Sequence, residues 1–157
     1  MQEIERKFLV KSEEFKHMSS KKSFFKQAYL NTDPARTVRI RITDDKAFMT
    51  IKGKSSENGL SRFEWEKEIP VHEAEELFKI CEPGKIEKYR YLINYGEHVY
   101  EVDEFLEENK GLTIAEIELN SEGEQFKKPE WLGAEVTGNL KYYNSNLITN
   151  PFKNWKQ

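Results

Sequence analysis

The chain has 157 residues, of which 34% are charged and 37% hydrophobic, and its formal net charge is only −3. Such a balance excludes the global basic excess typical of proteins that bind nucleic-acid backbones, and an aromatic content of 13% argues against disorder. The single cysteine, Cys81, excludes an internal disulfide and a cysteine-ligated metal cluster. No apolar run could span a membrane and the first residues are acidic, unlike a signal peptide, so we expect one cytoplasmic domain over residues 1–157.

Residues 1–10 form the first predicted strand. Glu3, Glu5 and Lys7 are spaced by two, and successive side chains of a strand point to opposite sides, so all three share one face. Taken alone, this row is typical of the solvated face of a half-buried strand. The rest of the chain decides whether it belongs to a site.

Alternation of polar and apolar residues predicts further strands along the chain. The predicted elements are, in order, a short helix at 12–15, a basic turn at 21–22, strands at 24–30, 37–43, 47–53 and 61–69, a helix at 71–81, strands at 85–95, 99–105 and 113–120, a packed loop at 129–133 and a short helix at 139–148. The serine-rich residues 54–60 predict a mobile loop. In the last helix we expect Leu140, Tyr143 and Leu147 on the apolar side. This pattern predicts one mainly antiparallel β domain of about eight strands with a few helices.

Nearly every predicted strand has one apolar face and one face with charges of a definite kind. The basic members are Lys7, Arg39, Arg41, Lys52, Arg62, Lys88 and Arg90. The acidic members are Glu3, Glu5, Glu64, Glu66, Asp103, Glu116 and Glu118. An open sheet with cross-strand ion pairs on its wet face would also carry charges, but neutral Thr, Ser and Gln usually replace many of them there. We therefore favour a closed barrel in which the charged faces all point into one lumen.

A lumen lined by both signs of charge needs a ligand that pairs with both, because unpaired buried charges are costly. Arginine and lysine donate to phosphate oxygens, while carboxylates bind hard cations such as Mg²⁺ or Mn²⁺. Divalent metals bridge phosphate oxygens and can activate a water for in-line attack. The pattern therefore favours a tunnel that binds a polyphosphate together with a divalent cation.

Residues 3–7, Glu-Ile-Glu-Arg-Lys, resemble the ExExK signature of the CYTH superfamily, the triphosphate tunnel metalloenzymes. Similar elements follow in order over nearly the whole chain, at 39–41, 50–52, 61–64, 87–90, 102–103, 117–118 and 141–144. The resemblance implies a mainly β fold, a closed eight-stranded antiparallel tunnel with a few helices packed outside. It also implies dependence on a divalent metal and a triphosphate-bearing small molecule as substrate.

The resemblance also implies roles for individual residues. It implies metal ligands at Glu3, Glu5, Asp103, Glu116 and Glu118. It implies phosphate ligands at Lys7, Arg39, Arg41, Lys52, Arg62, Lys88, Arg90 and Lys141. Tyr29, on a strand expected near the first, resembles the tyrosine that partners the signature lysine in small bacterial members. We expect catalytic contributions from Glu5, Lys7, Tyr29 and Glu64. Glu64 and Glu66 match acidic positions of the family, and their role stays open between second metal, water orientation and ion-pair support.

Other signals carry no comparable chemistry. His17, His72 and His98 are scattered and are expected on the surface, which argues against a Ser-His-Asp or Cys-His site. Residues 53–55 resemble the tail of a P-loop, but Phe48 stands where its leading glycine would be. The tryptophans and tyrosines fall mainly on apolar faces, so platforms for base stacking are not expected.

The expected activity is metal-dependent hydrolysis of inorganic triphosphate to diphosphate and phosphate. Phosphoryl transfer depends on positioning and charge neutralisation, which suits a charged tunnel without a nucleophile. The short chain leaves little room for a nucleoside or thiamine pocket. Adenylyl cyclase, nucleoside, thiamine or RNA triphosphatase, and a non-catalytic polyphosphate-binding module stay open as alternatives, as does a homodimer; no membrane or DNA partner is expected.

Overall fold

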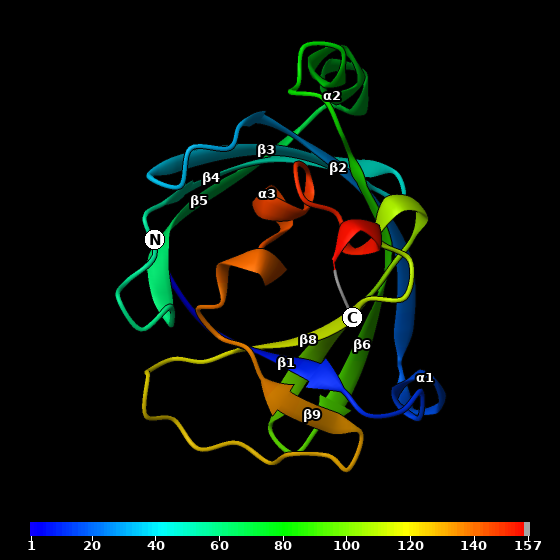
Figure 1. The fold of residues 1–157 in the computed structure, drawn as a ribbon, viewed down its shortest axis with the longest axis vertical. Coiled ribbons are helices and arrows are strands. Elements are labelled where there is room, and N and C mark those ends of the chain that lie inside the picture. Colours follow the sequence, from blue (N-terminus) through cyan, green and yellow to red (C-terminus); the bar gives the residue numbers. More distant parts are fainter. Residues whose placement is uncertain (156–157) are drawn as a thin grey trace.

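The computed structural model describes residues 1–155, and within them nine strands build an antiparallel barrel (Figure 1). The strands are β1 (Gln2–Val10), β2 (Lys21–Asn31), β3 (Arg36–Thr43), β4 (Lys46–Gly53), β5 (Ser61–Ile69), β6 (Ile86–Tyr95), β7 (His98–Phe105), β8 (Thr113–Glu118) and β9 (Leu132–Glu135). The helices are α1 (Phe15–Met18), α2 (Val71–Phe78) and α3 (Asn144–Leu147), with 3₁₀ turns η1 (Glu107–Asn109), η2 (Leu140–Tyr142) and η3 (Phe152–Asn154). Among these residues, no helix has the length and apolar character needed to cross a membrane.

Eight strands close the wall of the barrel and the ninth extends it. Neighbouring strands follow the order β5-β4-β3-β2-β6-β7-β8-β1-β9, and the additional pairing of β5 with β1 closes the ring. Glu3 lies opposite Arg62 in this closing seam, which has three paired positions. The C-terminal half of β1 pairs with β9 instead, so β1 serves two partners along one edge. The predicted closed eight-stranded antiparallel barrel is confirmed.

Apolar packing lies outside the wall and at one end of the barrel, not in the lumen. Strand alternation sends residues such as Tyr100 and Val102 of β7 outward, where Phe15 of α1 and Trp131 cover them. A second cluster forms under α2, whose Ala74 packs against the outer faces of β3 and β4. The strands can therefore present charged side chains inward because their opposite faces supply the hydrophobic core.

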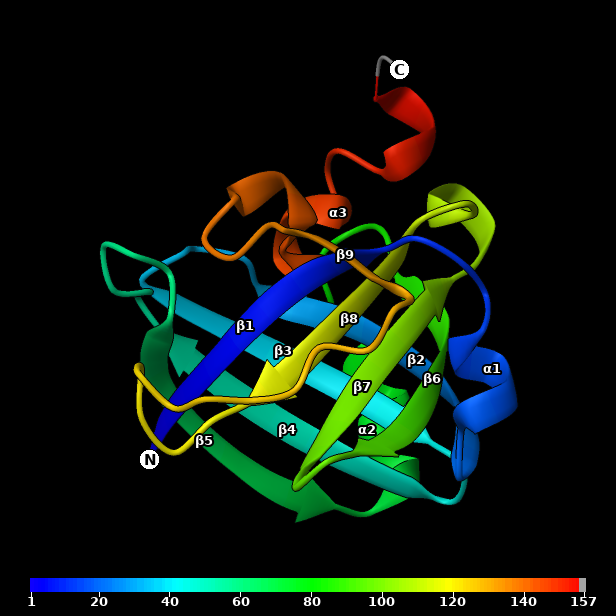
Figure 2. The same cartoon turned by 90° about the horizontal axis from the view of Figure 1, so that it is seen from below.

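The C-terminal segment covers one end of the barrel. Tyr142 and Leu147 pack against Phe105 and other apolar residues of the wall, and Phe152 and Trp155 extend this cluster. Viewed down the barrel, η2 and α3 fall within the ring of strands (Figure 1). The side view places α3 at one end of the barrel, near β9 (Figure 2). Residues 143–145 of this segment thus border the lumen together with the strands of the wall.

Three local predictions are wrong. Residues 21–22 belong to β2 and not to a turn, because they pair with Tyr91 and Leu92 of the long strand β6. Residues 132–133, the end of the packed loop expected at 129–133, instead begin β9 on the edge of β1. The expected helix at 139–148 is interrupted at Tyr143, whose backbone is extended with φ −73° and ψ 135°. The interruption leaves Leu140 60% exposed and directs Tyr143 toward the lumen.

Candidate active site

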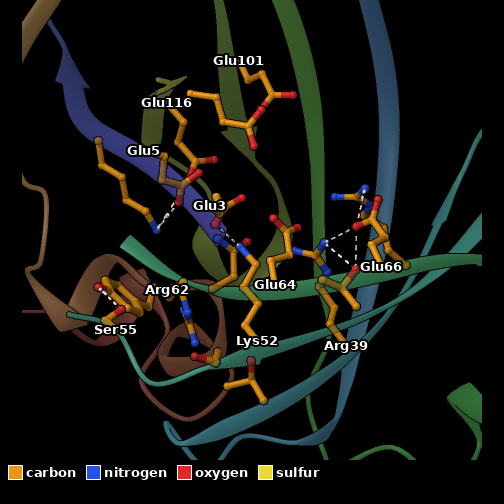
Figure 3. A pocket seen from close by; sticks show the side chains of 18 of the residues that line it. Glu3, Glu5, Arg39, Lys52, Ser55, Arg62, Glu64, Glu66, Glu101 and Glu116 are labelled. Atoms are coloured by element: carbon orange, nitrogen blue, oxygen red, sulfur yellow. Dashed lines mark hydrogen bonds and ion pairs between the residues drawn. The ribbon is translucent and has the colours of Figure 1, made fainter. Parts of the chain in front are cut away.

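A polar cavity of about 250 Å³ occupies the lumen (Figure 3). All eight strands of the wall contribute to it. Among the described residues its basic side chains are Lys7, Arg39, Arg41, Lys52, Arg62, Lys88 and Arg90. Its acidic side chains are Glu3, Glu5, Glu64, Glu66, Glu101, Glu116 and Glu118. Equal numbers of each sign keep the cavity near neutral overall, but the two signs are unevenly distributed within it.

The acidic part of the cavity brings three carboxylates from three strands together. Carboxylate oxygens of Glu3, Glu64 and Glu118 all lie within 4.8 Å of one another. Burial and a hydrogen bond to Glu3 raise the pKa of Glu64 to about 7, so this carboxyl retains a proton near neutrality. Burial also raises the pKa of Glu118, and repulsion from the neighbouring Glu3 and Glu101 raises it further. The cluster is electrostatically short of positive charge.

Two lysines face this acidic part. Lys52 Nζ donates to Glu3 Oε1 at 2.9 Å, and this contact lowers the pKa of Glu3 although burial opposes it. Lys7 Nζ lies 3.6 Å from Glu116 and 3.9 Å from Glu5. Burial and the nearby Glu116 raise the pKa of Glu5 well above its usual range. The ExExK row therefore has its two carboxylates and its lysine in one cavity, as its spacing predicts.

The opposite part of the cavity concentrates guanidinium groups. Burial, together with Arg39 and Arg90, lowers the pKa of Arg41 to about 9. Glu66 lies 3.5 Å from Arg39 and 3.7 Å from Arg41, and its Oε2 also accepts from the hydroxyl of Thr50. In the described structure the buried Nε atoms of Arg39 and Arg41 have no hydrogen-bond partner. Buried donors of this kind are usually satisfied, so this wall is suited to an anion.

A buried ion cluster lies beneath the arginine wall and includes a predicted metal ligand. Asp103 is 1% exposed and accepts from Lys88 Nζ at 2.7 Å and from Arg90 Nε at 2.8 Å. Burial opposes ionisation, but Arg90 and Lys88 hold the pKa of Asp103 far below its usual range. Asp103 is not among the residues that line the cavity. Its observed partners are the two cations, which it orients.

Lys141 is the predicted phosphate ligand that the structure places outside the cavity. Its ammonium lies 4.6 Å from the ring centroid of Trp155, and the residue is exposed. The reason is the interruption of the expected helix, which turns Tyr143 and Asn144 inward and Lys141 outward. Sequence periodicity could not reveal this interruption, because an uninterrupted helix fits residues 139–148 equally well.

All predicted site residues except Asp103 and Lys141 line the cavity. The strand of Tyr29, however, is not a neighbour of β1. Tyr29 is in the lining, but β2 stands four strands from β1 in either direction around the ring. The expectation that its strand lies near the first is therefore wrong. Of the histidines, His17 and His72 are exposed as expected, whereas His98 is half-buried with Nε2 2.6 Å from Glu124.

Several lining residues were not assigned from the sequence. They are Thr37, Thr50, Ser55, Gly59, Leu60, Glu101, Tyr143, Asn144 and Ser145. Inward alternation along a strand could have indicated Thr37, Thr50 and Glu101. The others come from the loop between β4 and β5, which has no periodicity, and from the C-terminal segment, where the predicted helix is interrupted at Tyr143.

The structure has a closed β-barrel whose lumen opposes carboxylates to lysines and arginines, which is the arrangement expected from the resemblance to the CYTH superfamily. The chain belongs to the CYTH domain family, whose model matches residues 1–150. It is 49% identical to a protein named inorganic triphosphatase from Acetivibrio thermocellus, over 99% of this chain and 98% of that protein. It is 36% identical to an inorganic triphosphatase of Nitrosomonas europaea, over 94% of this chain and 97% of that protein.

The solved structures agree on the fold. The crystal structure of the inorganic triphosphatase NE1496 superposes with a TM-score of 0.64 at 32% identity, covering 92% of this chain and 96% of that chain.

Proposed function

We propose that the protein hydrolyses inorganic triphosphate to diphosphate and phosphate inside the barrel, with the help of a divalent cation. The observation that carries this proposal is the opposition, within one cavity, of a carboxylate cluster and a wall of arginines with unpartnered donors. A metal-complexed triphosphate offers cations to the first and phosphate oxygens to the second. Two relatives that match nearly the whole chain are named inorganic triphosphatases, which supports the same activity here.

The carboxylate cluster suits a hard divalent cation. Its ligand atoms are all oxygens, and the proton held by Glu64 indicates that the cluster does not tolerate three negative charges without compensation. We propose Glu3, Glu5, Glu116 and Glu118 as metal ligands, with Glu64 joining them when it loses its proton. When bound, Mg²⁺ or Mn²⁺ would neutralise charge on the phosphate oxygens and lower the pKa of a coordinated water.

The basic residues bind and orient the phosphate chain. Arg39 and Arg41 present guanidinium donors to one part of the chain, while Lys7 and Lys52 face the end nearer the carboxylates. Arg62 lines the same cavity and approaches it from β5 (Figure 3). Lys88 and Arg90, fixed by Asp103, add positive charge from β6. Charge accumulating on the departing diphosphate would be stabilised by groups already in place, which is the main contribution a protein makes to phosphoryl transfer.

Two residues of the predicted catalytic set keep proposed roles in positioning. Tyr29 reaches the lumen from the wall opposite β1, where its phenol could donate to a phosphate oxygen. Glu64, protonated near neutrality when no cation is present, can release its proton and bind the cation as the substrate complex enters. We also propose that residues 1–157 act as one tunnel domain; its expected cytoplasmic location stays a prediction.

The decisive assay measures phosphate release from tripolyphosphate, ATP and thiamine triphosphate, each with Mg²⁺ and with Mn²⁺. We expect rapid release of one phosphate from tripolyphosphate, much slower release from the other two, and none after chelation of the cation. Cyclic AMP formed from ATP without free phosphate would contradict the hydrolase. Tight binding of tripolyphosphate without turnover would instead indicate a polyphosphate-binding module.

A further inference from the structure

The ring of Tyr143 lies against two cations of the cavity. Lys7 Nζ is 4.5 Å from the ring centroid, and the guanidinium carbon of Arg62 is 5.7 Å from it. These cations belong to β1 and β5, the strands whose short pairing closes the barrel. Tyr143 is only 9% exposed. It is the residue with extended backbone between η2 and α3, and its ring reaches both cations from there. The C-terminal segment therefore lays an aromatic face across the seam of the barrel.

The same segment also holds the backbone of Lys7. The amide of Lys7 donates to the hydroxyl of Thr137 at 2.9 Å, and the amide of Val136 donates to the carbonyl of Lys7 at 2.8 Å. Residues 136–143 thus contact Lys7 at both its main chain and its ammonium. Such double contact fixes the direction of a side chain that otherwise has four rotatable bonds.

The hydroxyl of Tyr143 is engaged on the other side of the ring. It lies 3.0 Å from Ser55 Oγ in the loop between β4 and β5. That loop packs closely on the C-terminal segment, since a Cβ on Gly59 would come within 2.3 Å of the Cα of Gly138. The next residue, Asn144, accepts from Lys88 Nζ at 3.1 Å and from Gln27 at 3.0 Å. The ring is therefore held in place by partners in several elements.

The position of the ring matters because Lys7 has competing attractions. Glu116 and Glu5 lie 3.6 and 3.9 Å from its ammonium, and both would draw it toward the carboxylate side of the cavity. The face of an aromatic ring attracts cations, most strongly where water is largely excluded. Tyr143 supplies that attraction to Lys7 and to Arg62 together. Without the ring, the ammonium would settle against the carboxylates and present fewer donors to a phosphate.

We propose that Tyr143 is a positioning residue, whose ring holds Lys7 and Arg62 in the direction from which they bind the phosphate chain. This inference rests on the proposed triphosphatase function. It adds the residue that fixes the directions of the two cationic side chains near the seam. Tyr143 acts through the two cations and not through the reacting atoms. Its loss should therefore weaken substrate binding more than it slows the chemical step.

The test compares the kinetics of tripolyphosphate hydrolysis in Tyr143→Leu, Tyr143→Phe and wild-type protein. We expect Tyr143→Leu to raise KM about tenfold, as for a largely buried cation–π contact, with a smaller change in kcat. Tyr143→Phe keeps the ring face and should restore KM to within about threefold of wild type. Tyr142→Leu is the matched control, because Tyr142 packs on Trp155 in the apolar cluster; it should lower the Tm and leave KM unchanged.

A double-mutant cycle separates positioning of Lys7 from a general structural effect. In a Lys7→Ala background, Tyr143→Leu should raise KM by no more than about threefold, through Arg62 alone. Equal increases with and without Lys7, or an effect of Tyr143→Phe as large as that of Tyr143→Leu, would overturn the proposal. So would a wild-type KM in Tyr143→Leu, or in Tyr143→Met should the leucine variant not fold. Absence of turnover in wild-type protein would overturn the proposed function itself, which keeps the two failures distinct.

Discussion

The pKa values of side chains in the lumen are shifted in ways that suit the binding of an anion and of a cation. Burial and adjacent arginines lower the pKa of Arg41 to about 9, whereas burial and the adjacent Glu3 raise that of Glu64 to about 7. Each shift reports a charge that lacks compensation in the free protein. Substrate and cation together would supply both kinds of compensation. The residues with shifted pKa values are therefore the ones whose replacement is most informative.

Arg41→Ala tests the arginine wall. It removes a charge-assisted contact to phosphate, which should weaken substrate binding by about 1.5–3 kcal/mol. KM for tripolyphosphate should therefore rise roughly 10- to 150-fold. The Tm should not fall greatly, because Arg41 is repelled by Arg39 and Arg90 in the free protein. Lys141→Ala is the control, since its ammonium lies on Trp155 outside the cavity. An unchanged KM and kcat in Arg41→Ala would remove this residue from the site.

Glu64→Gln tests the proton in the carboxylate cluster through the pH dependence of stability without divalent cations. Because the folded-state pKa of Glu64 is raised to about 7, its stabilising protonated form is fully present below pH 4.5, and that contribution is lost as the pH rises through 7. Glutamine keeps a donor toward Glu3 at every pH. The variant should therefore match wild type at pH 4.5 and exceed its Tm at pH 8, on the order of 2–4 °C per kcal/mol gained. Equal melting temperatures at both pH values would contradict the shared proton.

At the scale of the element, alternation along the strands determines most of the architecture. In β3, Arg39 and Arg41 point into the cavity while Ile40 is fully buried on the other face. A period of two in the sequence is therefore sufficient to predict both the strand and the direction of its charges. The inward placement of Glu3, Glu5 and Lys7 followed from the same reasoning.

Elements that depend on tertiary contacts could not be predicted in this way. β9 exists because the edge of β1 offers partners for Leu132 and Glu135, and its own four residues show no clear alternation. Interruption of the final helix at Tyr143 depends on contacts with the lumen and with Ser55. Lys141 lies outside the cavity for the same reason. Strand alternation correctly predicts that Asp103 points inward. It cannot predict that Lys88 and Arg90 bury the carboxylate, because that depends on the folded barrel.

Trp131 tests whether packing outside the wall stabilises the barrel. Its ring is 2% exposed and meets Phe15 of α1 and Tyr100 of β7 edge to face. Trp131→Ala should lower the free energy of unfolding by about 3–5 kcal/mol, as measured by denaturant titration. Trp131→Phe should lose much less, because the indole nitrogen has no hydrogen-bond partner among the described residues. Equal losses in the two variants would indicate that the ring contacts matter little.

At the scale of the whole molecule, the two faces of the sheet have different tasks. The outer face supplies most of the apolar packing that stabilises the fold, and the inner face carries the charged side chains of the proposed site. Apolar outer faces pack against α1 and α2, and the C-terminal segment packs on apolar residues at one end of the barrel. The inner faces carry seven acidic and seven basic side chains around the described cavity. Buried inner charges of this kind contribute little net stability, and in the proposed function they bind the ligand. Replacing one of them should therefore affect activity and stability in different ways.

Glu118→Ala tests this separation. Activity with tripolyphosphate should be abolished, because a proposed cation ligand is lost. The Tm without divalent cations should stay unchanged or rise, because burial and repulsion from Glu3 and Glu101 already disfavour the charged form of Glu118. Addition of Mn²⁺ should raise the Tm of wild-type protein but not of the variant. Substantial residual turnover would indicate that the acidic rows are not part of the site.

The most direct test of the central claim, that the lumen binds the triphosphate, is a crystal structure with tripolyphosphate in the absence of divalent cations. Without the cation the substrate should remain intact. We predict that its phosphate oxygens lie within hydrogen-bond distance of the Arg39 and Arg41 side chains, satisfying Nε atoms that have no hydrogen-bond partner among residues 1–155. Tripolyphosphate bound only on the outer surface, with the arginine wall unchanged, would contradict the account.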